Sequence, residues 1–233
     1  MNNQIKGLLY FYVNDFRHSF LIFWSILLLV LVVSISFSIF LLGYEDGMMA
    51  FGFPFGIYFY CAFLGFLAVK ESIPFAIKIG ATRKNIFISI GLFFILLAIF
   101  KALVANIIQE LVLLIVDNAN ITSFLFIHPA MMFDDTWFNR VIIDICMMFF
   151  LLAAMFVFGL LFYKFGIAGG GAVTGVLGVA LLLGMAKGWI FDFISNLVKQ
   201  IDIVFFYQVL GIGFLFFLIS FIFLRRITIE KKR

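Results

Sequence analysis

The sequence predicts an all-α polytopic membrane protein with six transmembrane helices. Of its residues 66% are hydrophobic and only 12% are charged, which leaves too little polar surface for a soluble globule. The charge-free runs are about twenty residues long, enough for a helix to cross a ~30 Å hydrocarbon layer. We expect one membrane domain over residues 1–233, with spans over 19–42, 48–69, 86–109, 141–163, 167–186 and 203–224.

The residues before the first span predict an element of their own. Apolar side chains recur there at spacings of three and four, at Ile5, Leu8, Leu9, Tyr12 and Phe16, as in an amphipathic helix. We expect an N-terminal interfacial helix over residues 1–18, lying along the inner membrane surface. The alternative is a slightly amphipathic lead-in to the first span.

Proline and glycine mark the second and fifth spans. Pro54 lies inside the second predicted span, and a proline within a helix predicts a kink. The fifth span carries two G-x-x-x-G spacings, a pattern that lets another helix approach closely. This face could pack within one subunit, form a subunit interface, or belong to a helix that slides or unwinds during a working cycle. The four helix-packing candidates are Gly166, Gly170, Gly171 and Gly175.

Two outer segments connect the later spans. Residues 110–140 contain Asn118, His128 and Pro129 and predict an irregular loop that is too short for a second core. Residues 187–202 place apolar side chains on a helical stripe that includes Trp189 and Phe193, which predicts a helix dipping into the outer interface.

The distribution of lysine and arginine predicts that both termini are cytoplasmic. With that orientation, inner segments hold twelve basic residues and outer loops hold three. The inner residues are Lys6, Arg17, Lys70, Lys78, Arg83, Lys84, Lys164, Arg225, Arg226, Lys231, Lys232 and Arg233, and the outer ones are Arg140, Lys187 and Lys199.

Two ionisable residues, Lys101 and Asp144, fall inside predicted spans. Such groups are functional candidates because each costs several kcal/mol in hydrocarbon unless it is paired or hydrated. Both fall in the outer leaflet, so they could form an ion pair. Alternatively, Lys101 extends to the interface and Asp144 meets Arg140, one helical turn away.

Catalytic and metal-binding motifs are missing from the sequence. It contains no H-E-x-x-H, G-x-S-x-G or P-loop pattern, and the predicted topology puts His18 and His128 on opposite sides of the membrane. Cys61 and Cys146 lie within spans, where free cysteine behaves as a small hydrophobe. We therefore expect no catalytic residue, no metal, no cofactor and no enzymatic activity in this chain itself.

The inner segment between the second and third spans predicts a short cytoplasmic helix. Ser72 can cap it, Pro74 suits its first turn and Gly80 can end it, while Thr82 caps the following span. Two turns cannot bury their own apolar side, so we expect this helix to bind a partner. The predicted ATPase-coupling residues are Ser72, Ile73, Pro74, Phe75, Ala76, Ile77, Lys78, Ile79 and Gly80.

With these elements in place, the chain resembles the membrane subunits of ABC-2-type exporters. In that family an amphipathic connecting helix precedes six spans, and the second cytoplasmic segment is a coupling helix that docks on an ATP-binding subunit. The resemblance rests on this layout and on the stretch from Gly80 to Lys84. It implies a small permease of the bacterial plasma membrane, with a pair of separate ATPase subunits, a second permease that is identical or paralogous, and spans one and five near the two-fold axis.

The resemblance and the Phe- and Met-rich spans together predict export of a hydrophobic or amphipathic cargo, such as a membrane-active peptide or a lipid. Two alternatives stay open: a non-transporting membrane immunity or assembly protein, and the substrate-binding membrane component of a vitamin uptake system. The latter would be expected to carry small alanine-type docking residues in its first span, where residues 26–40 offer only Ser34, Ser36 and Ser38.

Overall fold

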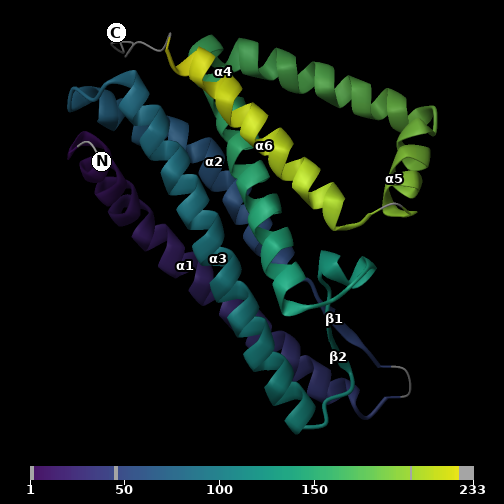
Figure 1. The fold of residues 1–233 in the computed structure, drawn as a ribbon. Coiled ribbons are helices and arrows are strands. Elements are labelled where there is room, and N and C mark those ends of the chain that lie inside the picture. Colours follow the sequence, from purple (N-terminus) through teal and green to yellow (C-terminus); the bar gives the residue numbers. More distant parts are fainter. Residues whose placement is uncertain (1–2, 45–46, 200, 226–233) are drawn as a thin grey trace.

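Six α-helices and one small sheet make up the part of the chain that the computed structural model describes, residues 3–44, 47–199 and 201–225 (Figure 1). The helices are α1 (Asn3–Leu41), α2 (Phe53–Lys78), α3 (Arg83–Asn118), α4 (Trp137–Ala186), α5 (Trp189–Lys199) and α6 (Ile203–Leu224). The strands are β1 (Met49–Phe51) and β2 (Phe124–Phe126), and a 3-10 helix, η1, spans Pro129–Met132.

The first helix is continuous, so the separate interfacial helix predicted over residues 1–18 is not formed. α1 runs for 39 residues, about 58 Å, without a turn before Ser19. The predicted apolar stripe is confirmed as its packed face, because Ile5, Leu8, Tyr12 and Phe16 are buried. That face lies against α3, so the stripe reflects helix packing.

Pro54 is the second residue of α2, so it does not kink a span. The proline lies in the first turn of the helix, where its missing N–H costs nothing, and residues 49–51 before it form a strand instead of the start of the span. At the other end, α2 continues through Pro74 to Lys78. The separate two-turn helix predicted for Ser72–Gly80 is therefore wrong: these residues are the last turns of α2 and the exposed turn that follows.

The turn between α2 and α3 uses the predicted residues. Gly80 has a φ of +76°, a left-handed conformation that glycine adopts without strain. The Thr82 side chain accepts a hydrogen bond from the Asn85 backbone N–H and caps α3. A contact between the Asn85 and Gln4 side chains, 2.6 Å long, joins this end of α3 to α1.

α3 extends through Asn118, so the loop predicted for 110–140 is partly helical. Beyond it, β2 pairs in parallel with β1, with Met49 opposite Phe124 and Phe51 opposite Phe126. A buried serine pair supports this sheet: Ser123 Oγ donates to the Ser38 carbonyl and accepts from Ser38 Oγ, both at 2.7 Å. Nothing in the hydrophobic pattern predicts this pairing, which joins segments 75 residues apart.

α4 is broken at Gly166, near the predicted boundary between the fourth and fifth spans. Gly166 has a φ of 67° and a ψ of −171°, which no helix contains. The twenty residues after it are helical again, about 30 Å long. Figure 1 shows this part of α4 turning away from the first part and running across one end of the bundle to α5.

Five helices of the described residues are long and apolar enough to cross a membrane: α1, α2, α3, α4 and α6. The chain is therefore a membrane-embedded helical protein. The two segments of α4 form one helix in this count, so the sixth span, over 167–186, stays a prediction. The first turns of α1, the α2–α3 turn and the last turns of α6 lie at the same end of the bundle (Figure 1).

Candidate functional site

Asp144 lies at the centre of a buried polar cluster among the apolar helices. Its carboxylate accepts hydrogen bonds from the Tyr58 hydroxyl of α2 at 2.5 Å, from Asn106 Nδ2 of α3 at 2.7 Å and from His128 Nε2 at 3.3 Å. All four side chains are buried. The cluster therefore joins α2, α3 and the segment between β2 and η1 to α4.

The histidine tautomer follows from its second contact. His128 Nδ1 accepts a hydrogen bond from the Ala130 backbone N–H at 3.0 Å, so this nitrogen carries no proton. The proton of the neutral ring is then on Nε2, where it is donated to Asp144. His128 caps η1 with one nitrogen and holds the carboxylate with the other.

Lys101 is fully buried in a cage of aromatic rings. Its ammonium nitrogen lies 3.8 Å from the centroid of the Tyr60 ring, 5.0 Å from Phe23 and 5.2 Å from Phe20. Such cation–π contacts are each worth about 0.5–2 kcal/mol. Within the described residues this nitrogen has no hydrogen-bond partner, so the rings supply its main stabilisation.

Lys101 and Asp144 form no ion pair within the described part of the chain. The alternative is not found there either, because Lys101 is buried among aromatic rings and Asp144 does not contact Arg140. Asn106, which bonds Asp144, is five residues after Lys101; that spacing is about 140° around the helix and 7.5 Å along it, so the lysine points toward α1 instead of α4. Arg140 contacts Glu110 at 2.8 Å and Asp135 at 2.5 Å and leaves Asp144 to the other partners.

Some of the predicted coupling residues are buried inside the protein and others are exposed. Ser72, Ile73 and Ala76 are buried, and the Phe75 ring stacks on Phe11 of α1 with centroids 3.6 Å apart. The Phe75 ring thus stabilises the contact between α2 and α1. The exposed part is the turn itself, where Ile79 retains 57% of its surface.

Two residues of the predicted glycine face, Gly171 and Gly175, make no close contact inside the chain. A Cβ added to Gly171 or Gly175 would have no atom within 4 Å, and Gly170 would meet only Phe162 of the same α4. Packing of Gly171 and Gly175 within one subunit is therefore excluded for the described arrangement. The other two interpretations, a subunit interface and a moving helix, stay predictions.

Close helix packing is found instead at glycines that we did not predict. A Cβ on Gly65 of α2 would collide with the carbonyl oxygen of Leu152 in α4, and one on Gly159 of α4 would lie 2.9 Å from the Phe66 oxygen of α2. Each glycine stands where the two backbones meet. A search for G-x-x-x-G could not find them, because that pattern needs two glycines on the same helix and these lie on different helices.

The partners of the two buried charges were also missed. A tyrosine or asparagine inside a span, such as Tyr58 or Asn106, is a signal because it needs a polar partner there. His128, in the predicted outer loop, gives no such signal because only the fold brings it to Asp144. Among the described residues, no group of three or more His, Cys, Asp or Glu side chains could hold a metal ion.

Fold and site together define a membrane-embedded helical protein with a buried polar cluster that links three of its long helices. Comparisons with protein-family models, with curated proteins and with solved structures gave no match. The function is therefore inferred from the residues and their geometry.

Proposed function

We propose that this chain is the permease subunit of an ATP-driven exporter, powered by separate ATP-binding subunits and acting as a dimer. The observation that carries the proposal is the segment over residues 167–186. It is apolar and helical, yet its side chains are mostly exposed, with Val176 at 70%, and its glycine face is open at Gly171 and Gly175. A second permease that packs on this face would complete the translocation path.

The first helix supports the same assembly. In its most apolar stretch of 18 residues 17% are buried, against 56% in α2. Exposure alone fits contact with lipid. The resemblance to ABC-2-type exporters, however, implies that the first and fifth spans lie near the two-fold axis, and these are weakly covered segments. Each would contact the second subunit along one of its faces.

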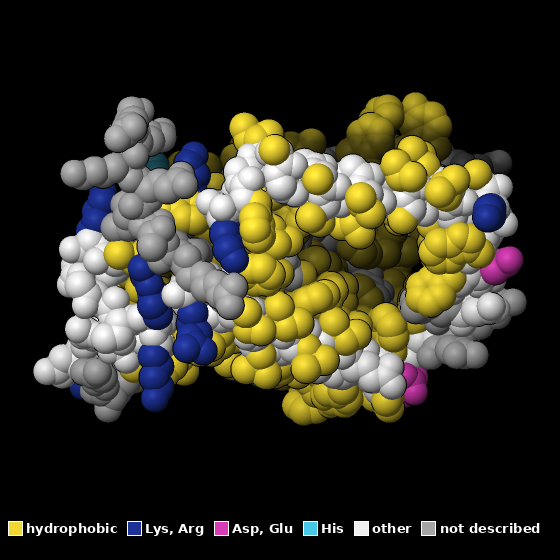
Figure 2. All heavy atoms as spheres, turned by 90° about the horizontal axis from the view of Figure 1, so that it is seen from above, with side chains coloured by type: hydrophobic (Ala, Val, Ile, Leu, Met, Phe, Trp, Pro, Cys, Tyr) yellow, Lys and Arg dark blue, Asp and Glu magenta, His cyan; other side chains and the backbone are white. Residues whose placement is uncertain are grey.

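A hollow lined by apolar side chains supports a hydrophobic or amphipathic cargo. Figure 2 shows a hollow bordered by hydrophobic side chains between the second part of α4, α5 and α6, with Lys and Arg side chains gathered on the opposite side of the same face. Such a wall has few groups for specific polar recognition and accepts varied apolar surfaces. We propose a hydrophobic or amphipathic cargo, such as a membrane-active peptide or a lipid.

The contact with the ATPase is assigned to the exposed turn after α2. Ile79 is exposed there, next to Lys78 in the chain and five residues before Lys84, both exposed as well. An exposed apolar side chain with basic residues near it in the chain fits a groove with an acidic rim. Phe75, another of the predicted coupling residues, is the poorer probe. Its substitution would also remove the stack on Phe11.

Affinity purification in mild detergent tests this proposal. We expect the tagged chain to retain a vanadate-sensitive ATPase activity, and we expect Ile79→Asp to lose at least 90% of it while the yield of folded chain is unchanged. Ile127→Asp is the matched control, since Ile127 is also exposed but lies next to β2, at the other end of the bundle. A wild-type chain that retains no ATPase would favour the non-transporting immunity or assembly protein.

A further inference from the structure

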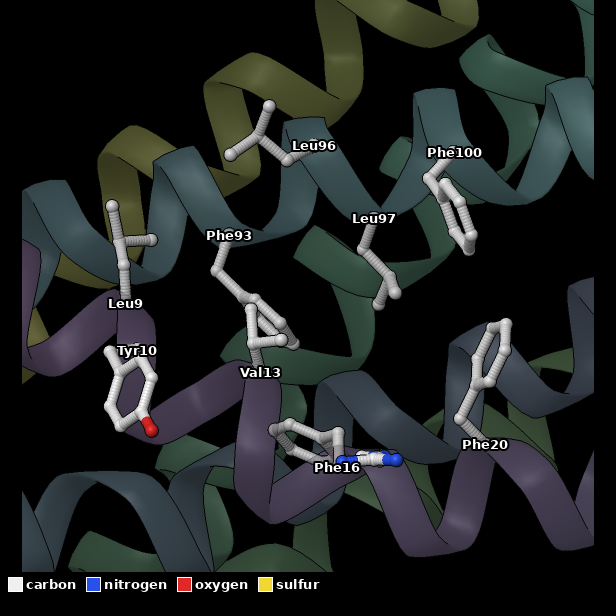
Figure 3. Close-up of a pocket in the computed structure, with 10 residues that line it drawn as sticks. Leu9, Tyr10, Val13, Phe16, Phe20, Phe93, Leu96, Leu97 and Phe100 are labelled. Carbon is white, nitrogen blue, oxygen red and sulfur yellow. The ribbon is translucent and has the colours of Figure 1, made fainter.

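An apolar groove follows the contact between α1 and α3 on the outside of the bundle. It has a volume of about 600 Å³, and its walls come from Leu9, Val13 and Phe20 of α1 and from Phe93, Leu97 and Phe100 of α3, among others. Figure 3 shows these side chains facing one another from the two helices. From Leu9 to Phe20 the groove is about 16 Å long.

Arg17 is the one charged residue in the groove wall among the residues that the structure describes. Its side chain is exposed, and among the described residues no carboxylate pairs with it, because the ion pairs there involve only Arg140 and His128. An arginine on an apolar wall is complementary to an anion that carries an apolar chain.

The position of Arg17 along the chain sets the depth of the site. The predicted first span begins at Ser19, two residues later, so Arg17 lies near the level where hydrocarbon gives way to head groups. Exposed basic residues of the same end, Lys6 and Lys84 among them, add to the attraction for an anionic surface. The apolar wall beyond Arg17, with Phe20 and Phe100, points toward the bilayer centre.

We propose that this groove binds an anionic phospholipid of the inner leaflet, with its phosphate on Arg17 and the upper part of one acyl chain on the wall beyond it, at Phe20 of α1 and Leu97 and Phe100 of α3. A phospholipid fits better than a peptide because the wall offers Arg17 and the Tyr10 hydroxyl as its polar groups, and no row of donors and acceptors for a backbone. The site is independent of the ATPase contact and of the export activity proposed above.

Native mass spectrometry of the purified chain tests the proposal with two probes, phosphatidylglycerol and phosphatidylcholine carrying the same acyl chains. We expect at least tenfold more phosphatidylglycerol than phosphatidylcholine to be retained at equal concentration. Arg17→Gln should bring the two lipids to the same level, whereas Lys6→Gln, on the same helix but outside the groove, should leave the preference intact.

A second pair of variants tests the acyl chain. Leu96, 58% exposed in the groove wall, can be replaced by Trp to fill the groove, and Leu96→Trp should lower retention of both lipids at least fivefold. Leu111, 55% exposed on α3 outside the groove, provides the control Leu111→Trp, which should change nothing. Folding of each variant is checked by its thermal unfolding curve.

Three results would overturn the proposal. Equal retention of both lipids by the wild type would show that the groove does not select an anionic head group. Unchanged retention in Arg17→Gln, or in Leu96→Trp, would put the lipid elsewhere. Dissociation of the lipid when the chain dimerises, or when an amphipathic peptide is added, would assign the groove to a second copy or to that peptide.

Discussion

Replacing Asp144 by alanine removes the acceptor that joins three helices and the β2–η1 segment. The Tyr58 hydroxyl and His128 Nε2–H then lose their partner, while Asn106 Nδ2 keeps its bond to the Ala102 carbonyl. Two buried donors are therefore left unsatisfied. The expected result is a lower free energy of unfolding without loss of membrane insertion, because the helices remain long and apolar.

The magnitude follows from the two orphaned donors. A buried donor without an acceptor costs about 1–3 kcal/mol, which gives roughly 2–6 kcal/mol in total. Interhelical hydrogen bonds in membranes average only ~0.6 kcal/mol, with a maximum near 1.7, and removing the buried charge also removes its desolvation cost. Both effects favour the lower half of the range, so we expect Asp144→Ala to lose about 2–4 kcal/mol. Asp144→Asn keeps one acceptor oxygen and should lose about half as much.

Reversible unfolding of the detergent-purified protein by added SDS measures this loss. Asp117→Ala, at an exposed carboxylate near the end of α3, is the control and should change the free energy of unfolding by less than about 0.5 kcal/mol. The reasoning is refuted if Asp144→Ala unfolds like that control. It is also refuted if Asp144→Asn is as damaging as Asp144→Ala, because the hydrogen-bond count would then not set the cost.

Three further predictions concern packing, the buried lysine and topology. Gly65→Ala should lower the free energy of unfolding by about 1–3 kcal/mol in the same assay, because a Cβ meets the backbone of α4. The control Gly211→Ala, in open space on α6, should not destabilise the protein. Equal effects of the two variants would contradict the close contact at Gly65. Lys101→Met should cost less than about 1 kcal/mol, since the lost cation–π contacts are offset by removal of a buried charge, and a loss as large as that of Asp144→Ala would reveal a partner other than the rings. In a background without native cysteines, a membrane-impermeant thiol reagent on intact cells should label cysteine at position 117 but not at position 6, and labelling at position 6 would reverse the orientation.

Local patterns in the sequence predicted the helix ends well where a single residue decides them. Thr82 caps α3 and Gly80 takes a left-handed conformation after α2, whereas Gly166, predicted as a helix-packing residue, breaks α4 instead. Each of these depends on the backbone preference of one residue or on one side-chain hydrogen bond. The same local rules failed at Pro74. A proline can begin a helix or be accommodated inside one, and packing of Ile73 and Ala76 favours continuation.

The candidate site could be predicted only in part because its contacts are long-range. Lys101 and Asp144 were found because charges in a span stand out against apolar neighbours. Their partners depend on which way each helix is rotated. The Asp144 cluster brings together residues up to 86 positions apart, and the direction of Lys101 follows from the packing of α3 on α1, which the periodicity of an almost wholly apolar helix does not define.

ATP-driven transport measured directly is the strongest test of the proposed function. Inside-out membrane vesicles that contain the chain and its ATPase would be given a fluorescent amphipathic cationic peptide, and its uptake into the lumen would be followed with and without ATP. We predict uptake that requires ATP, is abolished by vanadate and disappears in vesicles with Ile79→Asp. Uptake that is the same with and without the chain, while the ATPase is present and active, would contradict the assignment of this protein as an exporter permease.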